Sequence, residues 1–174
     1  MKHKIGVVGS AAGNSEELNE LAREVGREIA RNNCVLFSGA CPGFSFESAK
    51  GAKEAGGFVV GVSPAHNLRE HVEVYEFPTE HFDVIIYTGF GLKGRNVIWV
   101  RSCDAVIAVS GRIGTLNELT IAYDEGKTIG ILSGTGGVAD KFEEILKLAA
   151  GKKGGKVIYV SDPKKLVEEL VESL

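Results

Sequence analysis

Short apolar runs alternate along this chain with longer segments whose apolar residues recur every three or four positions. Runs rich in Val and Ile are typical of strands buried on both faces of a sheet. They occupy residues 5–8, 34–37, 58–62, 84–87, 105–109, 128–132 and 157–160. Helical spacing or helix-boundary residues mark the segments between them, at about 15–31, 44–55, 92–102, 115–125, 138–149 and 163–173. Residues 63–82 are polar and irregular.

Strands that alternate with helices predict a parallel sheet joined by right-handed crossovers. The expected fold class is therefore α/β, with a single doubly wound, Rossmann-like parallel sheet and helices on both faces. The length of 174 residues fits one domain comfortably. Because no repeat or linker interrupts the pattern, we expect one domain over residues 1–174.

The ends of the predicted strands carry the residues of a binding site. In an open parallel sheet, ligands bind beyond the carboxyl ends of the strands. Four such ends are rich in Gly and hydroxyl residues, at 9–13, 38–43, 110–114 and 133–137. Small residues let backbone N–H groups approach an anion closely, beside a helix N-terminus. The domain is therefore expected to bind a phosphate-bearing small molecule of the nucleotide type.

Charge and hydropathy narrow the choice of partners. The chain has 20 basic and 23 acidic residues, for a net charge of −3, and its basic residues are scattered. Nucleic acid is therefore not an expected partner. The sequence shows no signal-peptide pattern and no run of 18 apolar residues. No membrane partner is expected, and the expected location is the cytoplasm.

Cysteine and histidine spacing does not indicate a metal site. Cys34, Cys41 and Cys103 fit neither a disulfide framework nor a zinc site, and Cys34 and Cys103 are expected to be small buried side chains. His66 and His71 are five residues apart, which is not the spacing of a helical metal pair. Surface positions are expected for both histidines.

The sharpest motif runs from Ser110 to Glu118, between a convincing strand and a convincing helix. Gly111 and Gly114 would allow a tight turn against a ligand, and Thr115 would present a hydroxyl and an N–H group to a phosphate. A structural alternative is a capping box, in which Thr115 caps the helix and Glu118 reaches back to it. The spacing alone favours neither interpretation. Walker A, Gly-x-Gly-x-x-Gly and nucleophile-elbow patterns do not occur, so NAD is not expected.

Gly111-x-x-Gly114-Thr115-x-x-Glu118 resembles the Pro-Gly-Gly-x-Gly-Thr-x-x-Glu signature of the lysine-decarboxylase-like, or LOG, family. Members of that family are cytokinin-activating nucleoside 5′-monophosphate phosphoribohydrolases. The family also has an Arg on the preceding helix, and Arg95 occupies that place. The resemblance covers roughly residues 4–150 and is most specific in its second half.

The resemblance implies hydrolysis of the N-glycosidic bond of a nucleoside 5′-monophosphate, such as AMP, to free base and ribose 5-phosphate. It implies no required metal or cofactor, and a homodimer or homotetramer. Arg95 and Glu118 would be the catalytic residues. The phosphate would be bound by Gly111, Arg112, Gly114 and Thr115, and further ligand contacts are expected from Ser10, Gly39 and Ser110. Plain roles in turns, caps or a solvated helix surface are the alternatives for most of these residues.

Two departures from the signature support a second hypothesis. Ser110-Gly111-Arg112 replaces Pro-Gly-Gly, and residues 63–94 are this chain's own. In these respects the chain resembles a divergent branch that is similar to molybdenum-cofactor carrier proteins. The alternative function is therefore a non-catalytic protein that binds or carries a nucleotide or the molybdenum cofactor. An Arg at position 112 could grip a phosphate through two parallel hydrogen bonds.

Overall fold

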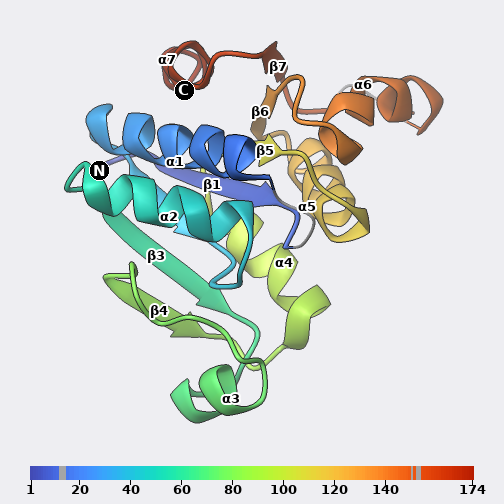
Figure 1. Cartoon of the computed structure of the whole chain (residues 1–174). Coiled ribbons are helices and arrows are strands. Elements are labelled where there is room, and N and C mark those ends of the chain that lie inside the picture. The colour runs from blue at the N-terminus through green and yellow to red at the C-terminus, as the bar shows by residue number, and fades with distance from the viewer. Residues whose placement is uncertain (12–14, 150, 152–153) are drawn as a thin grey trace.

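A seven-stranded parallel sheet forms the centre of the molecule in the computed structural model, which describes residues 1–11, 15–149, 151 and 154–174 (Figure 1). The strand order is β4-β3-β2-β1-β5-β6-β7, and every neighbouring pair is parallel. The strands are β1 (Lys4–Gly9), β2 (Val35–Ser38), β3 (Phe58–Ser63), β4 (Val84–Tyr87), β5 (Ala105–Val109), β6 (Thr128–Leu132) and β7 (Val157–Val160). This confirms the predicted α/β, Rossmann-like fold.

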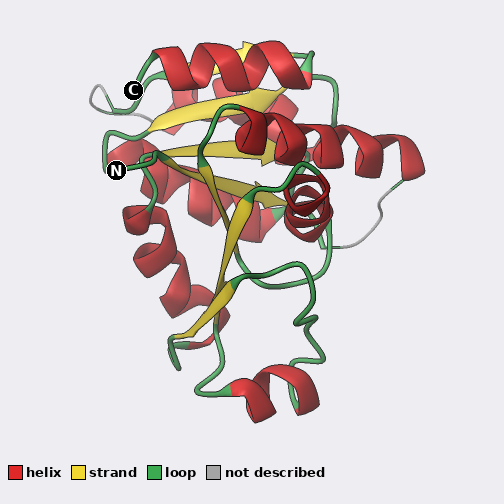
Figure 2. Ribbon diagram, turned by 90° about the vertical axis from the view of Figure 1, so that its left-hand side faces the viewer, coloured by secondary structure: helices red, strands yellow, loops and turns green. Residues whose placement is uncertain are grey.

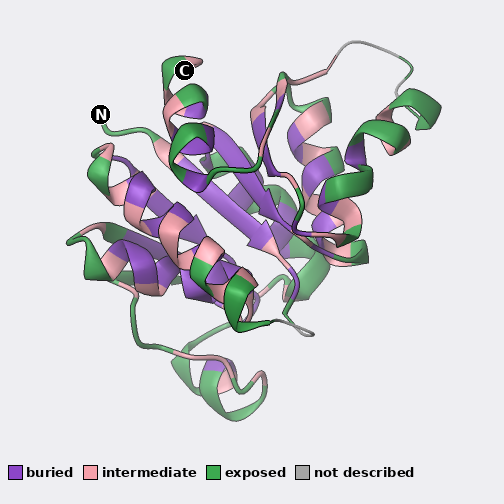
Figure 3. Ribbon diagram, turned by 45° about the horizontal axis from the view of Figure 1, so that its top comes forward, coloured by how far each residue is buried: buried purple, intermediate pink, exposed green. Residues whose placement is uncertain are grey.

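Helices cover both faces of the sheet (Figure 2). They are α1 (Glu16–Arg31), α2 (Phe44–Glu54), α3 (Leu68–Glu73), α4 (Gly91–Ser102), α5 (Ile113–Asp124), α6 (Gly137–Ala149) and α7 (Pro163–Glu172). Side chains of α1, α2 and α7 join one buried apolar cluster, and side chains of α4, α5 and α6 join a second one on the opposite face. The central strands are buried (Figure 3), which explains their unbroken apolar runs.

The order of the strands fixes where a ligand can bind. From β1 the chain adds β2, β3 and β4 on one side, and it then returns to place β5 on the other side of β1. The loops after β1 and β5 therefore leave in opposite directions and open a crevice at the carboxyl ends of these strands. The N-terminal end of α5 follows β5 directly at this switch point.

The irregular segment 63–82 contains one short helix, α3, that its polar composition did not indicate. Asn67 caps this helix by accepting a hydrogen bond from the Glu70 N–H at 3.0 Å. The expectation of a surface position is wrong for His71, which is fully buried, while His66 is exposed. His71 Nε2 donates to the Pro78 carbonyl at 3.0 Å, and Nδ1 accepts from the Ser63 hydroxyl at 2.8 Å.

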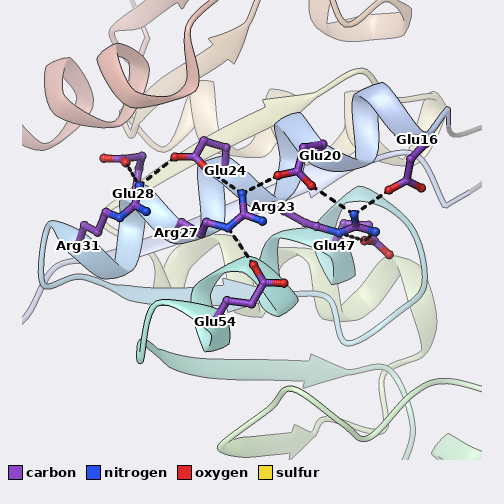
Figure 4. Close-up of polar contacts among 9 residues, drawn as sticks. All are labelled: Glu16, Glu20, Arg23, Glu24, Arg27, Glu28, Arg31, Glu47 and Glu54. Carbon is purple, nitrogen blue, oxygen red and sulfur yellow. Dashed lines mark hydrogen bonds and ion pairs between the residues drawn. The ribbon is translucent and has the colours of Figure 1, made fainter.

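Charged side chains alternate along α1 and link it to α2 (Figure 4). Arg23 pairs with Glu16 and Glu20 of its own helix and with Glu47 of α2, each within 3.3 Å. Arg27 repeats the pattern one turn later and reaches Glu54 of α2 at 2.8 Å. Exposed ion pairs are each worth only about 0–1 kcal/mol, and the Arg23–Glu47 pair is the most covered of those named above. Their arrangement nevertheless favours one orientation of the two helices.

The backbones of α1 and α2 approach each other closely at two glycines. A Cβ on Gly26 would lie 1.9 Å from the Ser48 carbonyl oxygen, and one on Gly51 would lie 1.9 Å from the Arg23 carbonyl oxygen. Both acceptor atoms belong to helix backbone, which cannot move aside without shifting the helix. The glycines therefore set the distance between α1 and α2.

No helix in the described part of the chain is long and apolar enough to cross a membrane.

We expect Gly51→Ala to lower the free energy of unfolding by about 1–3 kcal/mol, because the added methyl group forces the two helices apart. Alanine favours an isolated helix over glycine by about 1 kcal/mol, so propensity alone predicts the opposite sign. Urea unfolding would measure the change. Glu169→Ala, on the exposed face of α7, is the control. An unchanged or increased stability for Gly51→Ala would contradict the close approach.

Candidate functional site

A cavity of about 270 Å³ opens at the carboxyl ends of β1 and β5. This volume lies near the lower end of the range for small-molecule sites, which is roughly 300–1,000 Å³. The wall combines small residues, three cations and one carboxylate. It is formed by Gly9, Ser10, Ala11, Cys41, Leu92, Lys93, Arg95, Asn96, Arg112, Gly114, Thr115 and Glu118.

The first turn of α5 faces this cavity without a side-chain cap. Its N-cap residue is Arg112, whose side chain makes no capping hydrogen bond, and the Leu116 N–H donates to the Arg112 carbonyl at 2.9 Å. The N–H groups of residues 113–115 precede that bond and have no partner within the helix. Uncapped N–H groups and the positive end of the helix dipole favour an anion at this position.

The capping-box alternative for Thr115 and Glu118 is wrong. The helix begins at Ile113, two residues earlier than the sequence pattern indicated, so Thr115 lies inside the first turn. Thr115 is buried and lines the cavity. The side chains of Thr115 and Glu118 are thus both available to the cavity wall, and neither caps the helix.

A strained turn joins β5 to α5. Ser110 has φ 56° and Gly111 has φ 110°, and a Cβ on Gly111 would lie 2.5 Å from the Thr115 side chain. The left-handed conformation is costly for a residue with a side chain, so the surroundings must hold it. The Ser110 N–H donates to the Thr135 hydroxyl at 2.8 Å, and the Val138 N–H donates to the Gly111 carbonyl at 3.0 Å. The start of α6 thus fixes the turn that presents α5 to the cavity.

Arg95 projects from α4 into the opposite wall of the cavity and is only 4% exposed. Its Nη1 donates to the Val62 carbonyl at 3.3 Å, and its Nη2 lies 4.0 Å from the Cys41 sulfur. A Cβ on Gly39 would lie 2.2 Å from Nη1. Residue 39 must therefore be glycine for the guanidinium group to occupy this position.

Glu118 places a carboxyl group in the same cavity. Burial raises its pKa to about 7, against the opposing influence of Arg95 and Lys93. The indole N–H of Trp99 also lowers this pKa, although its geometry falls outside that of a regular hydrogen bond. A carboxyl group whose pKa lies near neutrality can exchange a proton at physiological pH, which is a property of many catalytic acids and bases.

Two further side chains of α4 complete the surroundings of Glu118. Lys93 Nζ lies 4.0 Å from the place that a Cβ would take on Gly114, beside the start of α5. Asn96 is buried, and its amide has two orientations: in one its nitrogen lies 3.3 Å from Glu118 Oε1 and 3.0 Å from the Leu92 carbonyl, and in the other the nitrogen donates to Asn117 Oδ1 at 2.8 Å. In the described residues, no group of three His, Cys, Asp or Glu side chains could hold a metal ion.

The model of the SLOG cluster4 family matches residues 2–167. The chain belongs to the SLOG cluster4 family. A relative from Mycobacterium tuberculosis, named cytokinin riboside 5′-monophosphate phosphoribohydrolase, is 33% identical over 70% of this chain. The match spans 63% of that relative's length. The predicted resemblance to the LOG family is thereby confirmed.

Two solved structures match this SLOG cluster4 protein over nearly its whole length. The molybdenum cofactor binding protein of Rippkaea orientalis has a TM-score of 0.81 and 29% identity, over 99% of this chain and 97% of that one. The Moco carrier protein of Chlamydomonas reinhardtii has a TM-score of 0.79 and 31% identity, over all of both chains. The predicted similarity to molybdenum-cofactor carrier proteins is also confirmed.

The fold brings six of the nine predicted site residues to one cavity. These are Ser10, Arg95, Arg112, Gly114, Thr115 and Glu118. The other three, Gly39, Ser110 and Gly111, are not part of its wall. Gly39 makes room for Arg95, while Ser110 and Gly111 form the turn before α5. The roles assigned to all nine residues remain predictions. Of the predicted glycine-rich end at 9–13, residues 12 and 13 lie outside the described residues.

Sequence reasoning missed Lys93, Asn96 and Cys41 as parts of this SLOG cluster4 cavity. A signal existed for two of them. Lys93 and Asn96 are three residues apart on the helix that carries Arg95, so their side chains share one face of that helix. For Cys41, the sequence offered only a position in the loop after β2, which is also typical of an ordinary turn residue.

The raised pKa of Glu118 has a cost in stability above neutral pH. The folded protein holds this proton up to about pH 7, whereas the ordinary pKa of a Glu side chain is 4.5. Stability should therefore fall as the pH rises from about 4.5 through 7 and then level off, by up to about 3 kcal/mol. We expect Glu118→Gln to stabilise the protein at pH 8 and to leave it nearly unchanged at pH 4.5. Urea unfolding at the two pH values tests this, and an equal effect at both would contradict it.

Proposed function

We propose that this protein binds a nucleoside 5′-monophosphate, such as AMP, and hydrolyses its N-glycosidic bond to free base and ribose 5-phosphate. The observation that carries the proposal is the position of Glu118. A carboxyl group whose pKa is about 7 shares one cavity with Arg95 and with the uncapped N-terminus of α5. An anion-binding end and a titrating carboxyl group are the two parts that a nucleotide hydrolase needs.

The phosphate would bind at the start of α5. The N–H groups of residues 113–115 would donate to its oxygens, with the Thr115 hydroxyl beside them. Arg112 is exposed at the rim of the cavity and Lys93 extends from α4 to the same place. Two cations and a helix dipole at one position suit the double negative charge of a phosphate monoester.

The chemistry would take place deeper in the cavity, at C1′ of the ribose. Cleavage of the bond between C1′ and the base nitrogen builds positive charge on the sugar ring. The ionised Glu118 carboxylate would stabilise that charge and polarise the attacking water. The water oxygen bonds to C1′ as the bond from C1′ to the base nitrogen breaks, and the proton that the water loses passes to the departing base. Arg95 would orient the ribose hydroxyls or the leaving base. No step requires a metal ion.

The name of the relative from Mycobacterium tuberculosis supports this reaction, since that protein is called a phosphoribohydrolase and is 33% identical over the matched region. The match covers only part of that protein. It therefore supports the class of reaction and does not identify the substrate.

Release of free base from a panel of nucleoside 5′-monophosphates tests the proposal. We expect Glu118→Gln to lower kcat by about 100-fold or more, because no carboxylate remains to stabilise the transition state. Arg112→Ala should raise KM for nucleotides about tenfold and leave the rate with unphosphorylated nucleosides unchanged. The control is Arg101→Ala, an exposed Arg of α4 that pairs with Glu125 away from the cavity. Full activity in Glu118→Gln would refute the mechanism.

The same mechanism fixes the sign of the pH dependence. The ionised form of Glu118 is the active one, so kcat/KM should rise with pH and level off above about 7. A rate that falls as the pH rises through 7 would instead assign Glu118 the role of proton donor to the base.

A second function, the binding or carriage of the molybdenum cofactor, is favoured by the two structural matches described above. Both of those proteins are named for this cofactor. A phosphorylated pterin has the same two parts as a nucleotide, namely a phosphate and a flat heterocycle. The residues fit such a group, because Lys93, Arg112 and the first turn of α5 would hold its phosphate whichever heterocycle it carries. In a carrier, the bound group would leave unchanged.

Thermal unfolding separates a carrier from an enzyme. If no nucleotide releases base, we expect one phosphorylated ligand, either a nucleotide or metal-free molybdopterin, to raise the Tm. A ligand at 100 times its Kd stabilises the folded state by about 2.7 kcal/mol. Arg112→Ala should roughly halve this shift, as expected for a Kd about tenfold weaker, whereas Glu118→Gln should preserve it. Absence of both base release and any stabilisation would exclude both functions for this cavity.

A further inference from the structure

Two buried N–H groups beside the cavity lack an acceptor. In the described part of the chain, three buried side-chain polar atoms have no hydrogen-bond partner, namely Asn19 Oδ1, Arg95 Nε and Trp99 Nε1. Two of these three belong to α4 residues that influence Glu118. A buried donor without an acceptor is costly, and it is rare in native structures. Both donors belong to residues that act on the Glu118 carboxyl group. An acceptor is therefore expected to reach them when that carboxyl group changes its orientation.

The Trp99 ring cannot move to find a different partner. It is 1% exposed, and a Cβ on Gly6 would lie 2.6 Å from one of its ring carbons. Gly6 lies in the central strand β1, so the indole fills a space that the sheet itself defines. One turn earlier on α4, Asn96 in one of its two amide orientations directs its nitrogen toward the same Glu118 carboxyl group. The donors are fixed, and the Glu118 side chain is the part that can rotate.

We propose that Trp99 is a positioning residue for Glu118: when the carboxylate is ionised, one of its oxygens accepts from the indole N–H and the Asn96 amide and the other oxygen is held facing the cavity, and this contact is lost when the carboxyl group is protonated. This inference rests on the proposed function and deepens it, since it names the residue that sets the orientation and charge of the carboxyl group assigned there to catalysis. It concerns only residues of this chain, and it can be tested without any turnover.

Trp99 differs from the other groups that face Glu118. Arg95 and Lys93 act on it through their charge, and the Cys41 thiol and Arg112 lie in the same cavity wall. A bound phosphate would neutralise much of the effect of these cations. The indole N–H carries no charge and is covered by the core, so its preference for the ionised carboxylate persists when a ligand is bound.

The single tryptophan of the chain makes the contact observable. Trp99 emission, excited at the red edge of the indole band, should change with pH in one step with a midpoint near 7, as Glu118 loses its proton. Glu118→Gln should show no such step between about pH 5 and 9. Glu125→Gln, at the far end of α5, is the control and should titrate like the wild type. A missing step in the wild type, or a step that survives in Glu118→Gln, would overturn the proposal.

A second measurement removes the donor. In protein labelled with ¹³C-glutamate, the Glu118 carboxyl resonance is identified by its loss in Glu118→Gln. We expect Trp99→Phe to raise the Glu118 midpoint by about one pH unit, because the ionised form loses a hydrogen-bond donor. Phe142→Leu, a change of similar kind in the same apolar cluster, should leave the midpoint unchanged. Equal midpoints in Trp99→Phe and wild type would overturn the proposal.

The two readouts are independent of catalysis. Should no nucleotide be hydrolysed while both titrations behave as expected, the assignment of Trp99 would stand and the hydrolase proposal would fail. Should hydrolysis occur with a flat fluorescence titration, the hydrolase proposal would stand and the positioning role would be excluded.

Discussion

The guanidinium group of Arg95 lies in a space that exists because residue 39 has no side chain. This contact joins the loop after β2 to α4, and it holds Arg95 in the wall of the cavity. A buried cation with few acceptors is costly unless something negative comes near. Glu118 supplies part of that charge, and an anionic ligand would supply more. The rest of the site can be understood as an arrangement around this one buried cation.

The balance of charge in the cavity is unequal. Three cationic side chains, Lys93, Arg95 and Arg112, line the wall together with Glu118, which burial keeps partly protonated near neutral pH. The positive end of the α5 dipole adds to the excess. Such an arrangement attracts an anion and leaves one carboxyl group ready to gain or lose a proton. A hydrolase and a carrier would both use the attraction, but only the hydrolase has a use for the proton.

Most of the fold follows from local pattern, because parallel strands buried on both faces are necessarily apolar and helices between them are necessarily amphipathic. All seven strands are apolar runs, and helical spacing or helix-boundary residues indicated six of the seven helices. Helix α3 has no such spacing, since six residues are too few to show a period, and His71 is buried through hydrogen bonds to Ser63 and Pro78 that no sequence pattern reveals. In the site, glycine and hydroxyl residues marked the strand ends correctly. Gly39 illustrates the limit, because its neighbour in space, Arg95, is 56 residues away in the sequence.

The strand order also determines when the cavity can come into existence. The pairing of β1 with β5 joins segments about 100 residues apart, as the bond from the Lys4 N–H to Asp104 illustrates. The ion pairs of α1, in contrast, are mostly three or seven residues apart and need no sheet to form. Closing a long loop costs more entropy than closing a short one. The cavity therefore depends on contacts between distant segments, and a nascent chain that ends before β5 contains the first four strands but not the start of α5 that would hold a ligand.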